Sequence, residues 1–106
     1  MRVTMTGFAK QQIRETATYI QKKFGKKYRD NFIKKVRATS LLLADNPNLG
    51  SIEPLLSDLP TTYRSVVVTK LNKMVYRILD DCIEVADIWD TRREPSTLAN
   101  QVKWKK

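Results

Sequence analysis

Two adjacent arginines, Arg92 and Arg93, follow an apolar run that ends at Trp89, and Pro95 comes shortly after them. A guanidinium group stays charged at physiological pH and can bind two oxygens of a phosphate or carboxylate at once. Two cations at the exit of a strand gain little from packing. The pair therefore indicates a binding site for phosphate groups or for the carboxylates of a partner.

Further side chains that could take part in chemistry lie on or beside the strand-like runs before this pair. They are Tyr63, Arg64, Lys73, Arg77, Glu84 and Asp90. Cleavage of RNA through its own 2′-hydroxyl needs a group that removes the hydroxyl proton, a cation that stabilises the pentavalent phosphate and an acid for the departing 5′-oxygen. The arginines and Lys73 suit the phosphate. Only weaker candidates, such as Asp90, Tyr63 and Glu84, remain for the protons.

A structural role is an open alternative for several of these residues. Arg64 and Arg77 fit a solvated sheet face, where strand alternation places polar residues in any case. Asp90 fits an ion pair with Arg92 or a turn cap better than a general base. The arginine pair at 92–93 is the part of the pattern that points most directly to anion binding.

The composition excludes several classes of site. The chain has no histidine, one cysteine and three glycines. A zinc site, a Cys-His nucleophile pair and a glycine-rich phosphate loop are therefore excluded, and we expect no metal ion or other cofactor. Cys82 alone cannot form an internal disulfide, and no apolar run reaches the length of a membrane span, so a cytoplasmic location is the default expectation.

Positive charge is concentrated in the first half of the chain. The 106 residues carry a formal net charge of +9, of which +8 belongs to residues 1–45. Such a basic half suggests a polyanionic partner, although scattered lysines also keep a small domain soluble. The length suits one domain with one modest core, spanning residues 1–106.

Hydrophobic spacing predicts the elements that position these residues. A short strand over 2–6 precedes a helix over 7–24, with Thr6 as its N-cap and Gly25 at its end. A second helix runs from about Lys26 to Asp45, where Pro47 prevents continuation. We expect the two helices to form an antiparallel hairpin whose apolar stripes include Phe24 and Tyr28.

The second half reads as a loop followed by three strands. Residues 46–61 carry three prolines, and Leu55, Leu56 and Leu59 should attach this loop to the body. The strands at 63–69, 73–79 and 82–89 are joined by short connections, which force an antiparallel meander. The fold class is therefore α+β, with the helical hairpin packed on the meander. Residues 95–106 are predicted to form either a short helix or a tail that orders on a partner.

This order of elements, ending in "KMVYRILDDCIEVADIWDTRREP", resembles the RelE/ParE superfamily of toxins from type II toxin–antitoxin modules, often called plasmid stabilisation proteins. The motif "VYRI", the acidic turn and the final strand that runs into Arg-Arg and proline carry the resemblance. It implies a cognate antitoxin that wraps the toxin, and a homodimer or a toxin–antitoxin hetero-oligomer. The RelE-like branch cleaves mRNA on the ribosome, whereas the ParE-like branch inhibits DNA gyrase without a known catalytic site.

The resemblance also implies roles for individual residues. Arg64, Lys73 and Arg93 (or Arg92) match basic positions of RelE-like ribonucleases, with Asp90 as a candidate for proton transfer. These cations are expected to converge at one end of the sheet and to form a phosphate clamp. Arg92, Arg93 and Arg77 would bind phosphate or antitoxin. A further basic position falls on Val66, and a tyrosine of some members falls near Ala99, so this chain keeps half of the ribonuclease pattern.

Three functions follow from these observations. The first is a toxin, an mRNA interferase, that binds ribosome-associated mRNA and, if it is an enzyme, cleaves it as a metal-independent endoribonuclease. The second is a ParE-like gyrase inhibitor with no enzymatic activity. The third is a general RNA- or DNA-binding module that uses the basic helical face.

Overall fold

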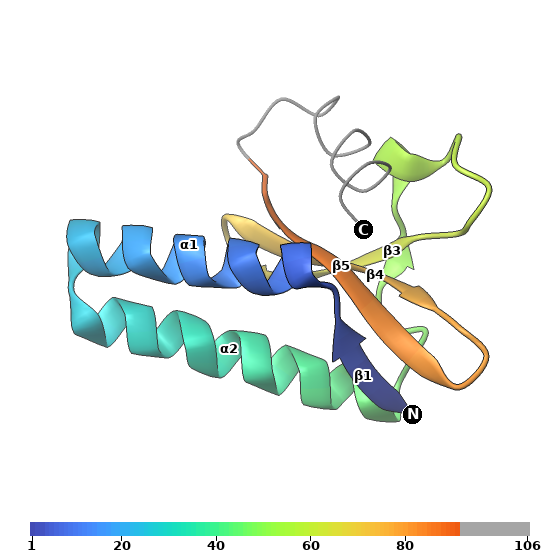
Figure 1. The fold of residues 1–106 in the computed structure, drawn as a ribbon, viewed down its shortest axis with the longest axis horizontal. Helices are drawn as coiled ribbons and strands as arrows, with labels where there is room; N and C mark the ends of the chain where they lie inside the picture. The colour runs from blue at the N-terminus through green and yellow to red at the C-terminus, as the bar shows by residue number, and fades with distance from the viewer. Residues whose placement is uncertain (92–106) are drawn as a thin grey trace.

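The computed structural model describes residues 1–91, which form two helices and a five-stranded sheet (Figure 1). In chain order the elements are β1 (Arg2–Met5), α1 (Gly7–Phe24), α2 (Lys26–Asp45), β2 (Ser51–Ile52), the 3-10 helix η1 (Pro54–Leu56), β3 (Arg64–Thr69), β4 (Asn72–Ile78) and β5 (Cys82–Asp90). The predicted α+β class, the helical hairpin and the antiparallel meander are confirmed.

The helical hairpin begins and turns at the two predicted residues. The Thr6 side chain accepts a hydrogen bond from the Ala9 amide at 3.0 Å, which satisfies one of the free N–H groups in the first turn. Gly25 has a φ of 103°, a conformation that side chains with a Cβ rarely adopt. This single residue lets the chain reverse, so α1 and α2 run antiparallel beside each other.

The sheet has the strand order β1-β5-β4-β3-β2. β1 pairs in parallel with β5, and the two-residue β2 pairs with β3. Neither pairing was predicted. β1 and β5 lie far apart in the sequence, and β2 is a two-residue strand within the segment 46–61 that was predicted as a loop. The helical hairpin and the strands β2, β3 and β4 all lie between β1 and β5 in the chain, and together they provide the long connection that a parallel pairing requires.

One face of the sheet packs against the helices. Its cluster contains, among others, Phe32, Val36 and Leu43 from α2 and Met74, Tyr76 and Ile83 from the sheet. The amphipathic stripes therefore have the predicted partner, since burying both apolar surfaces together removes the most area from water.

The loop after α2 covers the other face of the sheet. Leu56 and Tyr63 are 2% exposed and pack with Val75, Ala86 and Trp89. Leu55 and Leu59 are half-buried beside them, so the predicted attachment of this loop is confirmed. The sheet is thus covered on both faces, by helices on one side and by the loop on the other.

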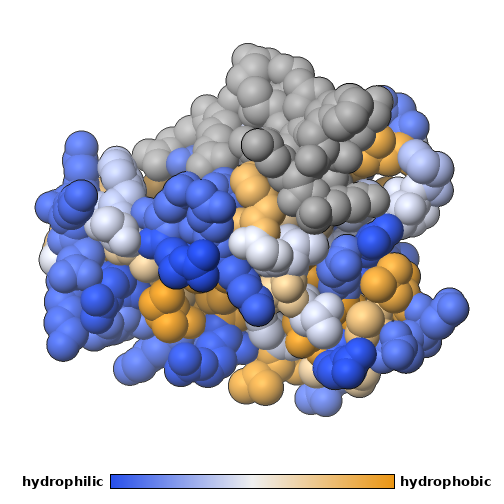
Figure 2. All heavy atoms as spheres, in the orientation of Figure 1, coloured by the Kyte–Doolittle hydropathy of each residue, from blue (hydrophilic) through white to orange (hydrophobic). Residues whose placement is uncertain are grey.

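The turn end of the hairpin, where α1 leads into α2, departs from the prediction. Phe24 and Tyr28 were expected on buried stripes, but they are 58% and 59% exposed. Figure 1 shows the reason: the helices extend past the strands at the end where α1 turns into α2, so no sheet lies beneath that turn. On the face drawn in Figure 2, mainly hydrophilic side chains surround this end.

Neither helix of residues 1–91 combines the length and apolar character that crossing a membrane would require.

Candidate functional site

Arg64 stands at the start of β3 and bonds to the loop after α2. Its Nη1 donates a hydrogen bond to the Gly50 carbonyl at 2.8 Å. The Gly50 amide in turn donates to the Tyr76 hydroxyl at 2.9 Å, and that hydroxyl donates to the Pro47 carbonyl at 2.8 Å. These bonds join the loop to the sheet. The guanidinium group of Arg64 therefore already has a structural acceptor.

Lys73 on β4 forms an ion pair with Glu53, a residue of the loop that sequence reasoning did not select. Glu53 is 2% exposed, and its second carboxylate oxygen accepts a hydrogen bond from Ser65 Oγ at 3.2 Å. A buried carboxylate needs such partners, because removing it from water is costly. The only signal in the sequence was a lone acid between Ile52 and Pro54, within an otherwise apolar stretch.

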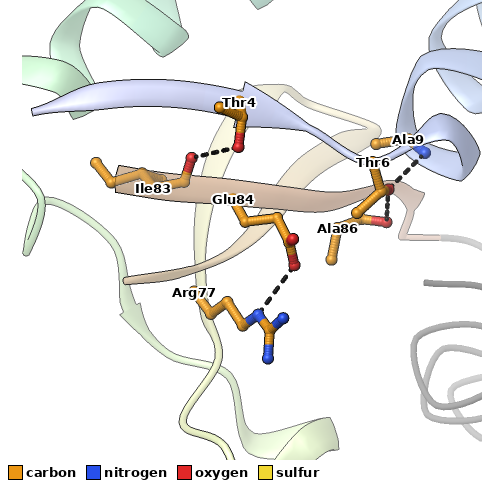
Figure 3. A network of polar contacts seen from close by, with 7 residues as sticks. All are labelled: Thr4, Thr6, Ala9, Arg77, Ile83, Glu84 and Ala86. Carbon is orange, nitrogen blue, oxygen red and sulfur yellow. Dashed lines mark hydrogen bonds and ion pairs between the residues drawn. The ribbon is translucent and has the colours of Figure 1, made fainter. Parts of the chain in front are cut away.

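Arg77 on β4 pairs with Glu84 on β5, directly across the sheet. Its Nε donates to Glu84 Oε1 at 2.9 Å, and the two side chains point toward each other in Figure 3. Both side chains are about four-fifths buried. Arg77 and Glu84 thus neutralise each other, and this cross-strand pair contributes to the pairing of the sheet.

The predicted gathering of Arg64 and Lys73 at one end of the sheet is wrong. Arg64 lies opposite Tyr76 and Lys73 lies opposite Val67, so the two register positions are three residues apart. Because side chains alternate between faces, an odd separation places Arg64 and Lys73 on opposite faces of the sheet. A separation of three residues also corresponds to a distance of about 10 Å between Arg64 and Lys73 along the strands. A single phosphate group cannot contact both.

The remaining predicted residues are also dispersed. Tyr63 belongs to the cluster under the loop and is 2% exposed. Asp90 lies opposite Asn72 and lines a cleft between the helices and the β3–β4 turn. Arg92 and Arg93 lie outside the described residues, as does the predicted helix or tail at 95–106.

The three cations of the predicted phosphate clamp that lie within residues 1–91 therefore already have acceptors inside the protein. Arg64 donates to a carbonyl, and Lys73 and Arg77 each pair with a glutamate. A phosphate would have to displace these acceptors before any of the three cations could hold it. Within residues 1–91, no three side chains of metal-ligand type lie together in a way that could hold a metal ion.

A groove on the outer side of the helical hairpin offers a different kind of surface. Its floor includes Ile13 and Ile33, which are half-buried, and its rim includes Arg14 and Arg37. Two adjoining hollows of about 560 and 370 Å³ share these four residues. Figure 2 shows apolar side chains among hydrophilic ones on the helical side of the molecule. An apolar floor with a basic rim is suited to binding an amphipathic segment with acidic residues.

Solved structures of several toxins share this fold. The chromosomal ParDE system of Pseudomonas aeruginosa matches with a TM-score of 0.70 at 15% identity, over 85% of this chain and 95% of that one. The YoeB dimer of Staphylococcus aureus matches with a TM-score of 0.56 at 23% identity, over 83% and 93%. The heterotetrameric YoeB–YefM toxin–antitoxin complex of Staphylococcus aureus matches with a TM-score of 0.53, at the same identity and over the same shares.

A comparison with curated protein sequences found no match. A family model does match, however, and it spans residues 3–95, which is most of the chain. Its description is the ParE toxin of the type II toxin–antitoxin system parDE. The resemblance seen in the strand motifs and the fold just described agree with this match, and the chain therefore belongs to the ParE toxin family of type II toxin–antitoxin systems.

Proposed function

We propose that this toxin arrests growth by binding a protein target rather than by cleaving RNA, and that the target is DNA gyrase. The ParE-like branch, which the sequence resembles, acts in this way. Unlike mRNA cleavage, this function requires no catalytic site.

The observation that carries the proposal is the state of the three predicted clamp cations. Arg64, Lys73 and Arg77 each have an acceptor inside the protein, and Arg64 and Lys73 lie on opposite faces of the sheet. An RNA-cleaving site needs cations that converge on one phosphate and are free to bind its oxygens. Binding to a protein surface has no such requirement.

We further propose that a cognate antitoxin silences the toxin by occupying the outer groove between α1 and α2. Ile13 and Ile33 would take the apolar side of an antitoxin helix, and Arg14 and Arg37 would pair with its acidic residues. Solved relatives of the same fold include a ParDE system and a YoeB–YefM heterotetramer, which supports an antitoxin partner. A YoeB dimer has also been solved, so self-association is the second assembly to test.

A supercoiling assay with purified gyrase tests the target. We expect relaxed plasmid to stay relaxed as the toxin is titrated against gyrase, and addition of the antitoxin to restore supercoiling. The double variant Ile33→Asp/Arg37→Glu should still inhibit gyrase but should escape the antitoxin. Full supercoiling at a large excess of folded toxin would contradict the proposal.

Cleavage of ribosome-associated mRNA remains the competing proposal. It is supported by Arg92 and Arg93 and by the RelE-like pattern of basic strand positions. Primer extension on mRNA from cells that express the toxin separates the two. Cuts within translated codons would favour cleavage, whereas intact transcripts during growth arrest would favour gyrase.

A further inference from the structure

A cleft of about 720 Å³ lies between the turn end of the helical hairpin and the β3–β4 turn. Tyr19, Phe24 and Tyr28 line it on the helical side, and Leu71 and Asn72 line it on the sheet side. It is separate from the outer groove, because the two share no lining residue. Nothing in the proposed gyrase or antitoxin binding uses this cleft.

The aromatic rings of the cleft are unusually accessible. Tyr19 is 48% exposed, Phe24 58% and Tyr28 59%. The rings of Phe24 and Tyr28 have centroids 6.0 Å apart and are inclined by 52°. Folding did not bury these rings, since the hairpin extends past the sheet at this end. Gathered apolar surface of this kind usually marks an interaction site.

Positive charge surrounds the same end of the hairpin. Residues 22–35 contain seven lysines and arginines and a single acid, Asp30. Arg29 is occupied, because it bonds to Asp30 at 2.8 Å and to Gln21 at 2.8 Å. Its hydrogen bond to Asp30, and to a lesser degree its charge, lower the pKa of the Asp30 carboxyl. The lysines at 22, 23, 26, 27 and 35 are all exposed. The aromatic surface is therefore surrounded by cations.

The inner wall of the cleft presents polar groups in a fixed orientation. Thr69 Oγ1 accepts hydrogen bonds from the Leu71 and Asn72 amides at 3.1 Å, and donates its own hydrogen to Asn72 Oδ1 at 2.9 Å. This arrangement fixes the Asn72 amide, because its oxygen must face the threonine. Its nitrogen is then turned away from Thr69 as a donor. Asp90 of β5 adds a carboxylate on the sheet side, and Glu15 of α1 adds one on the helical side.

We infer that this cleft binds a short single-stranded segment of nucleic acid. Bases would stack on Phe24 and Tyr28, and phosphates would follow the exposed lysines outside the cleft. The carboxylates of Glu15 and Asp90 repel phosphate, so they direct base edges rather than the backbone toward the inner wall. Aromatic rings, surrounding cations and polar groups that can contact base edges are the features that such a ligand requires.

Fluorescence anisotropy with labelled eight-nucleotide strands tests the inference. The probes are dT8, U8 and a DNA duplex. Comparison of the DNA strand dT8 with the RNA strand U8 shows whether the natural ligand is DNA or RNA. We expect both single strands to bind more tightly than the duplex. The double variant Phe24→Ala/Tyr28→Ala should weaken binding about tenfold or more, and Tyr28→Phe should retain it, because the phenyl ring still stacks.

A pair of variants with equal net charge separates a local site from general attraction. Lys26→Gln/Lys27→Gln removes two cations beside the cleft, and Arg2→Gln/Lys10→Gln removes two elsewhere. The first pair should reduce the slope of log affinity against log salt by about 1.4, whereas the second should leave it nearly unchanged. Circular dichroism confirms that each variant is folded.

Three outcomes would overturn the inference. They are equal binding of duplex and single strands, wild-type affinity in Phe24→Ala/Tyr28→Ala, and equal salt slopes for the two charge pairs. Anionic phosphatidylserine vesicles are the competing probe, and binding to them in place of the strands would assign the surface to a membrane. Gyrase inhibition is measured on the same variants, so failure of strand binding is distinguishable from failure of the gyrase proposal.

Discussion

The ammonium group of Lys73 and the carboxylate of Glu53 form an ion pair that joins β4 to the loop after α2. The carboxylate is 2% exposed, whereas the lysine side chain is 20% exposed. Lys73 was expected to bind phosphate, but in this ion pair it stabilises the attachment of the loop to the sheet. The ion pair also makes Glu53 dependent on Lys73 for its charge compensation.

The substitution Lys73→Ala should lower the free energy of unfolding by about 2–4 kcal/mol, because it leaves Glu53 charged and buried without its cation. Urea denaturation measures the change. The double variant Lys73→Met/Glu53→Gln should recover at least half of the loss, since it removes both charges. Wild-type stability of Lys73→Ala would show that Glu53 finds another partner.

Gly50 should not tolerate a side chain. A Cβ at this position would lie 2.5 Å from the Ser65 carbonyl oxygen and 2.9 Å from the Tyr76 hydroxyl. We expect Gly50→Ala to cost about 2 kcal/mol or more, through displacement of the loop from the sheet. Gly7→Ala is the matched control, because a Cβ there has nothing within 4 Å and alanine favours the helix. Thermal unfolding should give a lower Tm for the first variant and an equal or higher Tm for the second.

Tyr76→Phe should loosen the same loop. The hydroxyl accepts from the Gly50 amide and donates to the Pro47 carbonyl, so its removal leaves two polar groups without this partner. The expected cost is about 1–3 kcal/mol. Hydrogen exchange at the Gly50 amide reports the effect directly, and unchanged protection there would mean that the bond contributes little.

Thr6→Ala should shorten α1 at its start. The hydroxyl oxygen accepts from the Ala9 amide, as Figure 3 shows, and loss of such a cap costs about 1 kcal/mol. Thr6→Ser is the control, since serine caps equally well. Equal denaturation midpoints for the alanine and serine variants would contradict the capping role.

Growth arrest provides a functional test of the strand cations. If the toxin acts by binding, Arg64→Gln should keep toxicity at matched protein levels, with a stability loss of about 1 kcal/mol from its bond to Gly50. Arg93→Ala should likewise keep toxicity. A loss of toxicity in Arg93→Ala, with normal expression and folding, would favour the RNA-cleaving alternative.

The predictions from sequence were correct for those features of the structure that local interactions determine. Thr6, Gly25 and Pro47 marked the ends of the helices, because capping, positive φ and proline act over a few residues. The short connections between the last three strands correctly predicted the antiparallel meander. The parallel pairing of β1 with β5 was missed, because no short-range feature of the sequence indicates with which strand of the sheet a distant strand will pair.

The candidate site was harder to predict than the fold. The residue types correctly indicated that Arg64, Lys73 and Arg77 are cations on strands. A residue type does not show, however, which carboxylate or carbonyl group a cation will bind. Glu53 is twenty positions from Lys73 in the chain, and only the folded loop brings it to the lysine. Phe24 and Tyr28 kept the spacing of a buried stripe, yet the sheet ends before it reaches them.

The sequence by itself therefore determined the helices, the meander and the excess of positive charge, because spacing, caps and composition are local or additive properties. The tertiary structure alone decided which cations are neutralised, which face each one occupies and which aromatic rings remain exposed. The physical reason is that pairing and burial depend on register and on where each layer ends, and both are set by contacts between residues distant in the chain.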